Sequence, residues 1–346
     1  MTSRPFTRRV ALLGGAAVLL AACSTAAGTE PTTGSSLGSG VPATSLRPIS
    51  VILDWSPNTN HSGLYLAAAA GYYAAAGLDV TLVEPGDTSG LQLVAAGQAD
   101  FALSVAESLV PARAEGIPVV SVAAIIQHNT SSLVSLAATG IQTPKDLPGH
   151  TYGGYEGALE KALISALVRC DGGDPAAVTF TALPGDDFRI GLTEKYYDTA
   201  WIFNGWDGIR LRDLDGLDIN TIDFSDYTGC IPDWYTPLIA TGQSTIDGDP
   251  ELVRSFLAAT ALGYADAMTD PGRAVDALMA AAPELDRDLV TRSAEYLSTR
   301  YADAPAAWGV QTAATWTSFV GFLIENDLAP AGFDTGAAWD GSFLNS

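Results

Sequence analysis

Four segments of the chain place aromatic, polar or acidic side chains directly after short apolar runs. They are 54–61 (DWSPNTNH), 104–107 (SVAE), 155–160 (YEGALE) and 204–207 (NGWD). Three of these four segments set a Trp or Tyr directly beside an acid. An aromatic ring with carboxylates at its edge suits a flat ligand that carries N–H groups. The ring stacks on the ligand for about 0.5–1.5 kcal/mol beyond its area burial, and the acids accept its hydrogens.

We expect ligand contacts from the following side chains of these segments: Asp54, Trp55, Asn58, His61, Ser104, Glu107, Tyr155, Glu156, Glu160 and Trp206. Some of these positions also have a structural interpretation. Ser104 and Glu107 match the Ser-x-x-Glu capping box, whose two side chains hold the start of a helix. His61 opens a predicted helix, where a surface histidine or one satisfied within the fold is the alternative, and Trp206 could equally belong to the core.

Patterns typical of cofactor, metal and catalytic sites are missing from the sequence. The glycines of 153–157 (GGYEG) do not fit the dinucleotide or phosphate-loop pattern. The three histidines, His61, His128 and His150, occur without an HExxH motif, and the chain has no Cys-x-x-Cys or Gly-x-Ser-x-Gly motif. The sequence therefore predicts a binding protein, with neither a catalytic centre nor a metal or cofactor.

The three cysteines are too few for a disulfide scaffold or a four-cysteine zinc site. We expect Cys170 and Cys230 to be buried or unpaired thiols, with a disulfide between them as the alternative. The third, Cys23, ends the apolar segment near the N-terminus.

The first 23 residues have the features of an export signal. Three arginines precede an apolar run over 10–20, which is shorter than the roughly 20 residues of a membrane span. The sequence LAAC at 20–23 resembles the bacterial lipobox, in which the cysteine thiol is acylated. We therefore expect a signal peptide over 1–22, a lipid anchor on Cys23, and a flexible tether over 23–46 that is rich in Ser, Thr, Gly, Ala and Pro. The predicted location is the outer face of the cell membrane, reached by the general or the twin-arginine export route.

Strand-like and helix-like segments alternate through most of the remaining chain. Strands are predicted over 49–53, 79–83, 99–103 and 119–126, with helices over 61–76 and 89–96 and a further helix starting at Ser104. The alternation repeats as strands over 151–154, 178–183 and 199–203, with a helix over 158–169. Residues 250–328 follow a helical pattern. This order predicts an α/β fold with two lobes, each containing a largely parallel sheet, and a helical C-terminal region.

Composition limits the partners. The chain has 346 residues, of which 17 are Lys or Arg and 39 are Asp or Glu, giving a net charge of −22. Nucleic-acid phosphates would be repelled, so we expect no nucleic-acid partner. The helix N-termini beyond the strand ends are the predicted place for a small-molecule ligand.

Several motifs together resemble the thiamine-pyrimidine-precursor branch of ABC transporter substrate-binding proteins. They are 54–67 (DWSPNTNHSGLYLA), 71–73 (GYY), 77–80 (GLDV), 97–101 (GQADF), 116–119 (GIPV), 127–131 (QHNTS), 152–154 (YGG) and 201–209 (WIFNGWDGI). The similarity covers about residues 48–330 and is specific.

The resemblance implies the type II periplasmic-binding-protein fold, a cleft between lobes that close on ligand, an ABC permease as partner, and a monomer. It places lobe 1 at 47–134 and 238–346 and lobe 2 at 135–237, with chain crossings near 133–136 and 237–240. It also adds Asn129 to the ligand-contacting residues. The expected ligand is a planar nitrogen heterocycle, a pyrimidine precursor of the hydroxymethylpyrimidine or formylaminopyrimidine type.

Two alternatives come from related proteins. Riboflavin has a flat ring that could use the same aromatic stack. The same superfamily includes a fungal pyrimidine synthase, and the resemblance implies that this enzyme needs a Lys and a His in the segment matching 100–113, which here contains neither. Oxyanion ligands are disfavoured because the strand ends carry no Arg or Lys.

Overall fold

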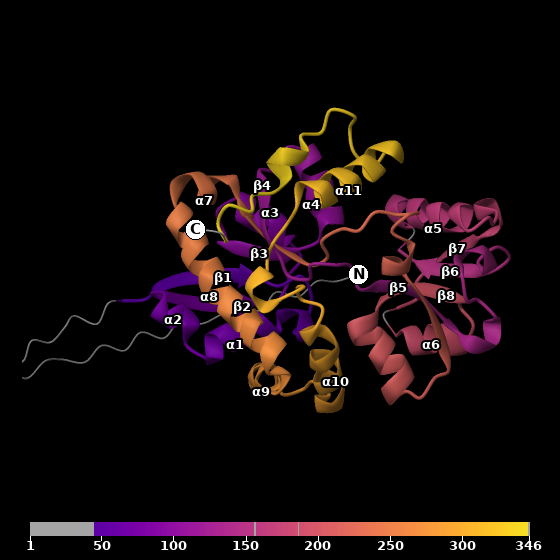
Figure 1. Cartoon of the computed structure of the whole chain (residues 1–346), viewed down its shortest axis with the longest axis horizontal. Coiled ribbons are helices and arrows are strands. Elements are labelled where there is room, and N and C mark those ends of the chain that lie inside the picture. The colour runs from indigo at the N-terminus through magenta and orange to yellow at the C-terminus, as the bar shows by residue number, and fades with distance from the viewer. Residues whose placement is uncertain (1–44, 156, 186, 345–346) are drawn as a thin grey trace, which may run out of the picture. The chain divides into compact units, whose positions relative to one another are not determined.

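The computed structural model describes residues 45–155, 157–185 and 187–344. The predicted signal peptide, Cys23, most of the tether and Glu156 therefore lie outside the described residues. The strands form two separate five-stranded sheets (Figure 1). Each sheet alternates with helices along the chain, as the α/β pattern predicts.

The first sheet has the strand order β2-β1-β3-β10-β4. Its strands are β1 (Arg47–Ile52), β2 (Leu78–Val83), β3 (Phe101–Ser104), β4 (Val119–Ala124) and β10 (Leu238–Gly242). β1 pairs in parallel with β2 and β3, so the carboxyl ends of these three strands lie at one edge. β10 arrives from far along the chain and pairs antiparallel to β3 and β4.

The second sheet has the strand order β7-β6-β8-β5-β9. Its strands are β5 (Ser131–Leu136), β6 (Thr151–Gly154), β7 (Thr179–Ala182), β8 (Thr199–Phe203) and β9 (Ile219–Asp223). β6 is parallel to β7 and β8, whereas β5 is antiparallel to β8 and β9. The two sheets thus share one design: in each, a single strand, β10 or β5, runs antiparallel to both of its neighbours and directly follows a crossing between the lobes.

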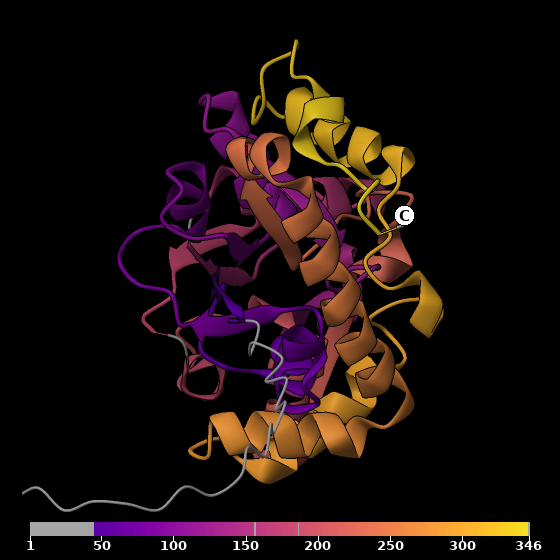
Figure 2. The ribbon, with the colours of Figure 1, turned by 90° about the vertical axis from the view of Figure 1, so that its left-hand side faces the viewer.

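Most helices belong to the first lobe. They are α1 (Ser62–Ala69), α2 (Tyr72–Ala75), α3 (Gly90–Ala95), α4 (Ala106–Ala114), α7 (Gln243–Gly248), α8 (Pro250–Thr269), α9 (Pro271–Ala281), α10 (Arg287–Ser298) and α11 (Ala313–Glu325), while α5 (Ala158–Cys170) and α6 (Phe188–Thr193) accompany the second sheet. α8 runs past the first sheet as the long orange helix of Figure 2. It packs on α1 so closely that a Cβ on Gly263 would lie 2.0 Å from the carbonyl oxygen of Gly63.

Local differences from the predicted elements have identifiable causes. The helix predicted over 61–76 is interrupted at Gly71, whose φ of 77° is left-handed. The helix predicted to start at Ser104 begins at Ala106, because Ser104 is still paired with Leu238 as the last residue of β3. The N-cap is Val105, so the capping box of Ser104 and Glu107 is wrong.

The chain crosses between the sheets earlier than predicted. The first crossing lies at 125–130, between β4 and β5, and the predicted crossing at 133–136 is instead part of β5. The second crossing, 228–237, ends where β10 begins, so most of the segment predicted over 237–240 is strand. The apolar character of residues 133–136 and 238–240 is compatible with strands. The hydrogen-bonded strand pairing in the structure shows which sheet each of them joins.

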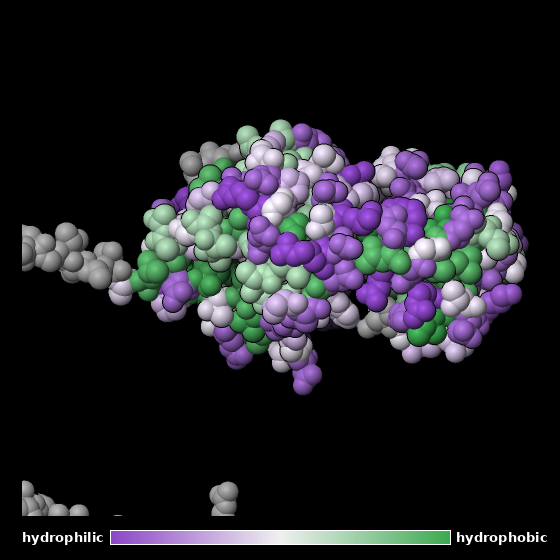
Figure 3. All heavy atoms as spheres, turned by 90° about the horizontal axis from the view of Figure 1, so that it is seen from below, coloured by the Kyte–Doolittle hydropathy of each residue, from purple (hydrophilic) through white to green (hydrophobic). Residues whose placement is uncertain are grey.

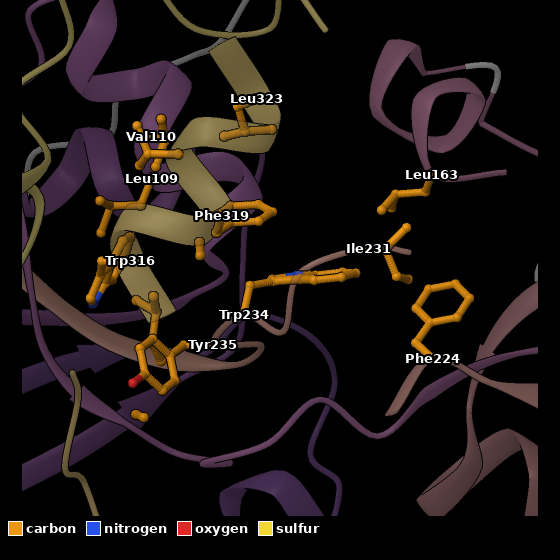
Figure 4. Packing of buried hydrophobic residues seen from close by; sticks show 14 of the residues in the cluster. Leu109, Val110, Leu163, Phe224, Ile231, Trp234, Tyr235, Trp316, Phe319 and Leu323 are labelled. Carbon is orange, nitrogen blue, oxygen red and sulfur yellow. The ribbon is translucent and has the colours of Figure 1, made fainter. Parts of the chain in front are cut away.

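The core is continuous across the crossings. One hydrophobic cluster joins Leu109 of α4 and Phe319 of α11 to Leu163 of α5 and Phe224, with Trp234 of the second crossing between them (Figure 4). The lobes are therefore connected by packed side chains as well as by backbone.

Cys170 and Cys230 form a disulfide, with their Cα atoms 5.7 Å apart. The prediction of unpaired thiols is wrong. The C-terminus of α5 reaches the turn at 228–230 that begins the second crossing, a proximity that a separation of 60 residues does not reveal. Among the described helices, none combines the length and the apolar character that crossing a membrane requires.

Candidate ligand-binding site

The turn after β1 is held by a compact hydrogen-bond network. The side-chain oxygen of Asn58 accepts the backbone N–H of Asn60 at 2.8 Å, and its amide donates to the carbonyl of Ser56 at 2.9 Å. The backbone N–H of Asn58 donates to Nδ1 of His61 at 3.3 Å. Asn58 thus caps the short helix 59–61 and fixes the turn that carries Trp55.

His61 is fully buried and engaged through both ring nitrogens. Because Nδ1 accepts the Asn58 N–H, the proton of the neutral ring lies on Nε2, which donates to Oδ1 of Asp54 at 2.7 Å. The geometry supports a role for His61 in orienting Asp54. Its direct contact with ligand stays a prediction.

Residues distant in sequence hold the same turn from beneath. The hydroxyl of Tyr264 donates to the carbonyl of Asn60 at 2.6 Å, and that of Tyr301 donates to the carbonyl of Thr59 at 2.5 Å. The hydroxyl of Thr59 also contacts the hydroxyl of Ser293 in α10 at 2.5 Å. The position of Trp55 therefore depends on the packing of the C-terminal helices.

Two predicted aromatic side chains stand exposed at strand ends, one in each lobe. Trp55, after β1, is 56% exposed, and Tyr155, after β6, is 74% exposed. Phe203, the last residue of β8, is 36% exposed and was missed by the sequence analysis. Its position as the final residue of a parallel strand was the available signal. Exposed rings at ligand-binding strand ends are candidates for stacking.

Trp206 differs from these rings. It lies in the π-helical turn 204–208 and packs, partly buried, against Val275, Val290 and Ala294 of α9 and α10. The nearby Gly205 carbonyl accepts the Ser293 hydroxyl. Trp206 therefore contributes to packing between the second lobe and the C-terminal helices, which favours the core interpretation.

Glu160 is buried and satisfied within its own lobe. Its Oε1 accepts the Tyr152 hydroxyl at 2.9 Å and the Tyr155 N–H at 3.2 Å, and Oε2 accepts the Gly157 N–H at 2.9 Å. The carboxylate thus caps α5 and shapes the turn that presents Tyr155. Ligand contact by Glu160 stays a prediction.

Glu107 faces the second crossing. Its Oε2 accepts the indole N–H of Trp234 at 2.9 Å, and burial raises the pKa of its carboxyl to about 7. Burial likewise raises the pKa of Asp207, after β8, to about 6. Ser104, predicted beside Glu107, is largely buried at the end of β3.

Asn129 lies in the first crossing with its side chain nearly fully buried. Its Oδ1 accepts the Ser131 N–H at 2.7 Å, which identifies the other end of the amide as Nδ2. Nδ2 has no acceptor among the described residues. A buried donor without an acceptor costs about 1–3 kcal/mol, so an acceptor on a ligand would be favourable here.

Two cavities lie away from these residues. One of about 650 Å³ is lined by Gln311 and Trp339 in the first lobe. The other, of about 460 Å³, is bounded by Arg210 and Asp215 of the second lobe and by Asp288 and Arg292 of α10. On the face drawn in Figure 3, hydrophobic residues occur in patches separated by hydrophilic ones. Among the described residues, no group of three or more His, Cys, Asp or Glu could hold a metal ion.

Two α/β sheets with these strand orders, joined by two crossings, define the type II periplasmic-binding-protein fold. A solved structure of this class, the periplasmic aliphatic sulphonate binding protein SsuA from Escherichia coli, superposes with a TM-score of 0.67 at 16% identity, covering 86% of this chain and 93% of that one. The chain belongs to the NMT1/THI5-like family, whose model matches residues 58–274.

Proteins similar to this chain carry different assigned functions. The formylaminopyrimidine-binding protein of Halalkalibacterium halodurans is 26% identical over 82% of this chain and 86% of its own length. A 4-amino-5-hydroxymethyl-2-methylpyrimidine phosphate synthase of Legionella pneumophila is 27% identical over 75% and 83%. The riboflavin-binding protein RibY of Chloroflexus aurantiacus is 27% identical over 97% of both chains.

Proposed function

We propose that this protein captures a thiamine pyrimidine precursor, of the formylaminopyrimidine or hydroxymethylpyrimidine type, between its two lobes and delivers it to an ABC permease. The observation that carries the proposal is the pair of exposed rings, Trp55 and Tyr155, at the carboxyl ends of β1 and β6. Closure of the lobes would bury a flat ligand between them.

Polar groups among the candidate residues suit an aminopyrimidine. Asp54, oriented by His61, supplies a carboxylate that can accept an exocyclic N–H. Asn129 supplies an amide N–H for a ring nitrogen or carbonyl oxygen. Such a ligand offers donors and acceptors together with a ring to stack, whereas an oxyanion would be repelled by the carboxylate.

Riboflavin is the second candidate, favoured by the relative RibY, whose alignment spans nearly the whole chain. An enzymatic role is the third, since a synthase is among the relatives. The segment 100–113 contains neither Lys nor His, the residue types that the synthase is expected to use there, which supports binding without catalysis.

A thermal-shift panel tests the ligand. Purified protein is heated with hydroxymethylpyrimidine, formylaminopyrimidine, thiamine, riboflavin or taurine. A ligand at 100 times its dissociation constant stabilises the fold by about 2.7 kcal/mol. We expect stabilisation by a pyrimidine. If only riboflavin stabilises the protein, riboflavin becomes the proposed ligand. If only taurine does, the proposed aromatic and acidic binding site is wrong.

The proposed location is the outer face of the cell membrane, with the acylated Cys23 as anchor, since 20–23 resembles a lipobox. Fractionation of cells expressing the Cys23→Ala variant should find the protein released from the membrane. Unchanged membrane retention would contradict the anchor without affecting the ligand proposal.

A further inference from the structure

Trp234 lies at the centre of the second crossing with its ring in contact with both lobes. The indole is 1% exposed and stacks on Phe319 of α11, with ring centroids 5.4 Å apart and planes at 15°. On its other side it meets Trp201 of β8 edge-on at 6.0 Å. Figure 4 shows the indole between Phe319 on one side and, on the other, Ile231 of the same crossing and Phe224 of the second lobe. A shift of this ring would therefore change the packing of both lobes.

Glu107 holds Trp234 from the first lobe. In the first turn of α4, its Oε2 accepts the indole N–H at 2.9 Å, and its Oε1 lies 3.5 Å from the hydroxyl of Thr236. Both contacts are to the second crossing. Hydrogen bonds to a carboxylate are stronger than those between neutral groups, and a buried indole N–H without an acceptor is unfavourable.

The two crossings are themselves linked next to Trp234. One carboxylate oxygen of Asp233 accepts the backbone N–H of Asn129 at 3.0 Å, and the other lies 2.8 Å from Nδ1 of His128. A displacement of the second crossing would therefore carry the first crossing with it, including the candidate ligand contact Asn129.

We propose that Glu107 is a positioning residue. It acts through Trp234 to hold the two crossings in the arrangement from which the lobes bind ligand. The proposal rests on the proposed function for its effect on affinity. It replaces the expectation of direct ligand contact by Glu107 with an indirect role. A Gln at this position keeps an oxygen for Trp234 and an amide for Thr236, whereas an Ala keeps neither.

Four variants separate positioning from direct contact: Glu107→Ala, Glu107→Gln, Trp234→Phe, and the double variant Glu107→Ala with Trp234→Phe. Two controls are Glu115→Gln and Trp316→Phe. Glu115→Gln removes an exposed acid from the end of the same helix. Trp316→Phe removes an indole N–H bonded to Gln311 and keeps an aromatic ring at the position that packs on Tyr235 of the second crossing. The readouts are amide hydrogen exchange of 228–237 without ligand and the dissociation constant of the ligand identified by the panel.

We expect Glu107→Ala and Trp234→Phe each to accelerate exchange in 228–237 and to weaken binding, both by roughly tenfold. The double variant should be no worse than either single variant, because both remove the same hydrogen bond. Glu107→Gln and the two controls should behave like the unmodified protein in this segment. Trp234→Phe keeps an aromatic ring beside Phe319, so it remains informative if Glu107→Ala does not fold.

Three results would overturn the proposal. The first is an unchanged hydrogen-exchange rate of 228–237 in Glu107→Ala and Trp234→Phe, and the second is a loss of affinity in the double variant that equals the sum of the two single losses. The third is an equal loss of affinity in Glu107→Gln and Glu107→Ala with an unchanged exchange rate. The third result would favour the original expectation that Glu107 contacts the ligand directly. If no ligand of the panel binds the unmodified protein, the proposed function fails, while hydrogen exchange still decides the role of Glu107.

Discussion

The turns after β1 and β6 present the same combination of an exposed aromatic residue and a carboxylate, yet they are held in different ways. In the second lobe, Glu160 binds Tyr152, Tyr155 and Gly157, all within eight residues in the chain. In the first lobe, the turn carrying Trp55 is held by the hydroxyls of Tyr264 and Tyr301.

The difference shows that the two lobes position their exposed aromatic residues by different means, one local in the chain and one tertiary. The second-lobe turn depends on local hydrogen bonds, all of them accepted by the single carboxylate of Glu160. The first-lobe turn depends on helices that follow it by some 200 residues, as the Asn60–Tyr264 separation of 204 residues shows. Substitutions that destabilise the C-terminal helices should therefore disturb the position of Trp55 more than that of Tyr155.

The largest expected effect comes from the cross-link of the second lobe. Replacing both cysteines, in a Cys170→Ser and Cys230→Ser variant, should lower the free energy of unfolding by about 4 kcal/mol, because the bond closes a loop of 60 residues. Urea denaturation of oxidised protein and variant measures the change. Equal stability would mean that local contacts alone hold the second lobe.

Next in size is the loss of the buried histidine under the first-lobe turn. His61→Ala should destabilise the protein by roughly 3 kcal/mol, since it leaves a cavity and removes a partner of Asp54 and of the Asn58 N–H. His150→Ala, which removes a partly exposed ring 3.4 Å from Asp198 in the second lobe, is the matched control and should change stability by less than about 1 kcal/mol. Similar losses in both variants would contradict the tertiary support of this turn.

A pH-dependent effect of similar size is expected from Glu107. Burial raises its pKa from 4.5 to about 7, so the folded state favours the protonated form. That contribution is fully present below pH 4.5 and is lost as the pH rises through about 7. Glu107→Gln has no proton to lose, so its stability relative to the unmodified protein should increase by about 3 kcal/mol over this range. Denaturation of both proteins at several pH values measures this change. If the carboxyl were not buried, the difference in unfolding free energy between the variant and the unmodified protein would stay constant with pH.

The smallest expected changes concern the rings themselves. Trp55→Ala and Tyr155→Ala should each weaken ligand binding by about tenfold, through loss of a stack worth about 1 kcal/mol together with buried area. Tyr196→Ala removes a ring that is 54% exposed just before β8, at the opposite end of that strand from Phe203, and should leave affinity unchanged. Isothermal titration calorimetry measures the dissociation constant of each of the three variants. A loss confined to Trp55→Ala would restrict the site to the first lobe.

Several features were predictable because they depend on neighbouring residues. Alternating apolar segments located β6 over Thr151–Gly154 and β8 over Thr199–Phe203, and the helix over 158–169 differs from α5 by one residue. Trp55 and Tyr155 were placed at strand ends, where the structure leaves them exposed. The order of strands and helices was sufficient for the fold class, since local hydrophobic periodicity determines each element.

Only the tertiary structure decided what the remaining candidates contact. Ser104 and Glu107 have the spacing of a capping box, but pairing of β3 with β10 extends the strand and turns Glu107 toward Trp234, 127 residues away. Cys170 and Cys230 meet because α5 ends against the second crossing. In each case the deciding contact joins segments far apart in the chain, and local propensity carries no information about which distant group will satisfy a buried polar or reactive side chain.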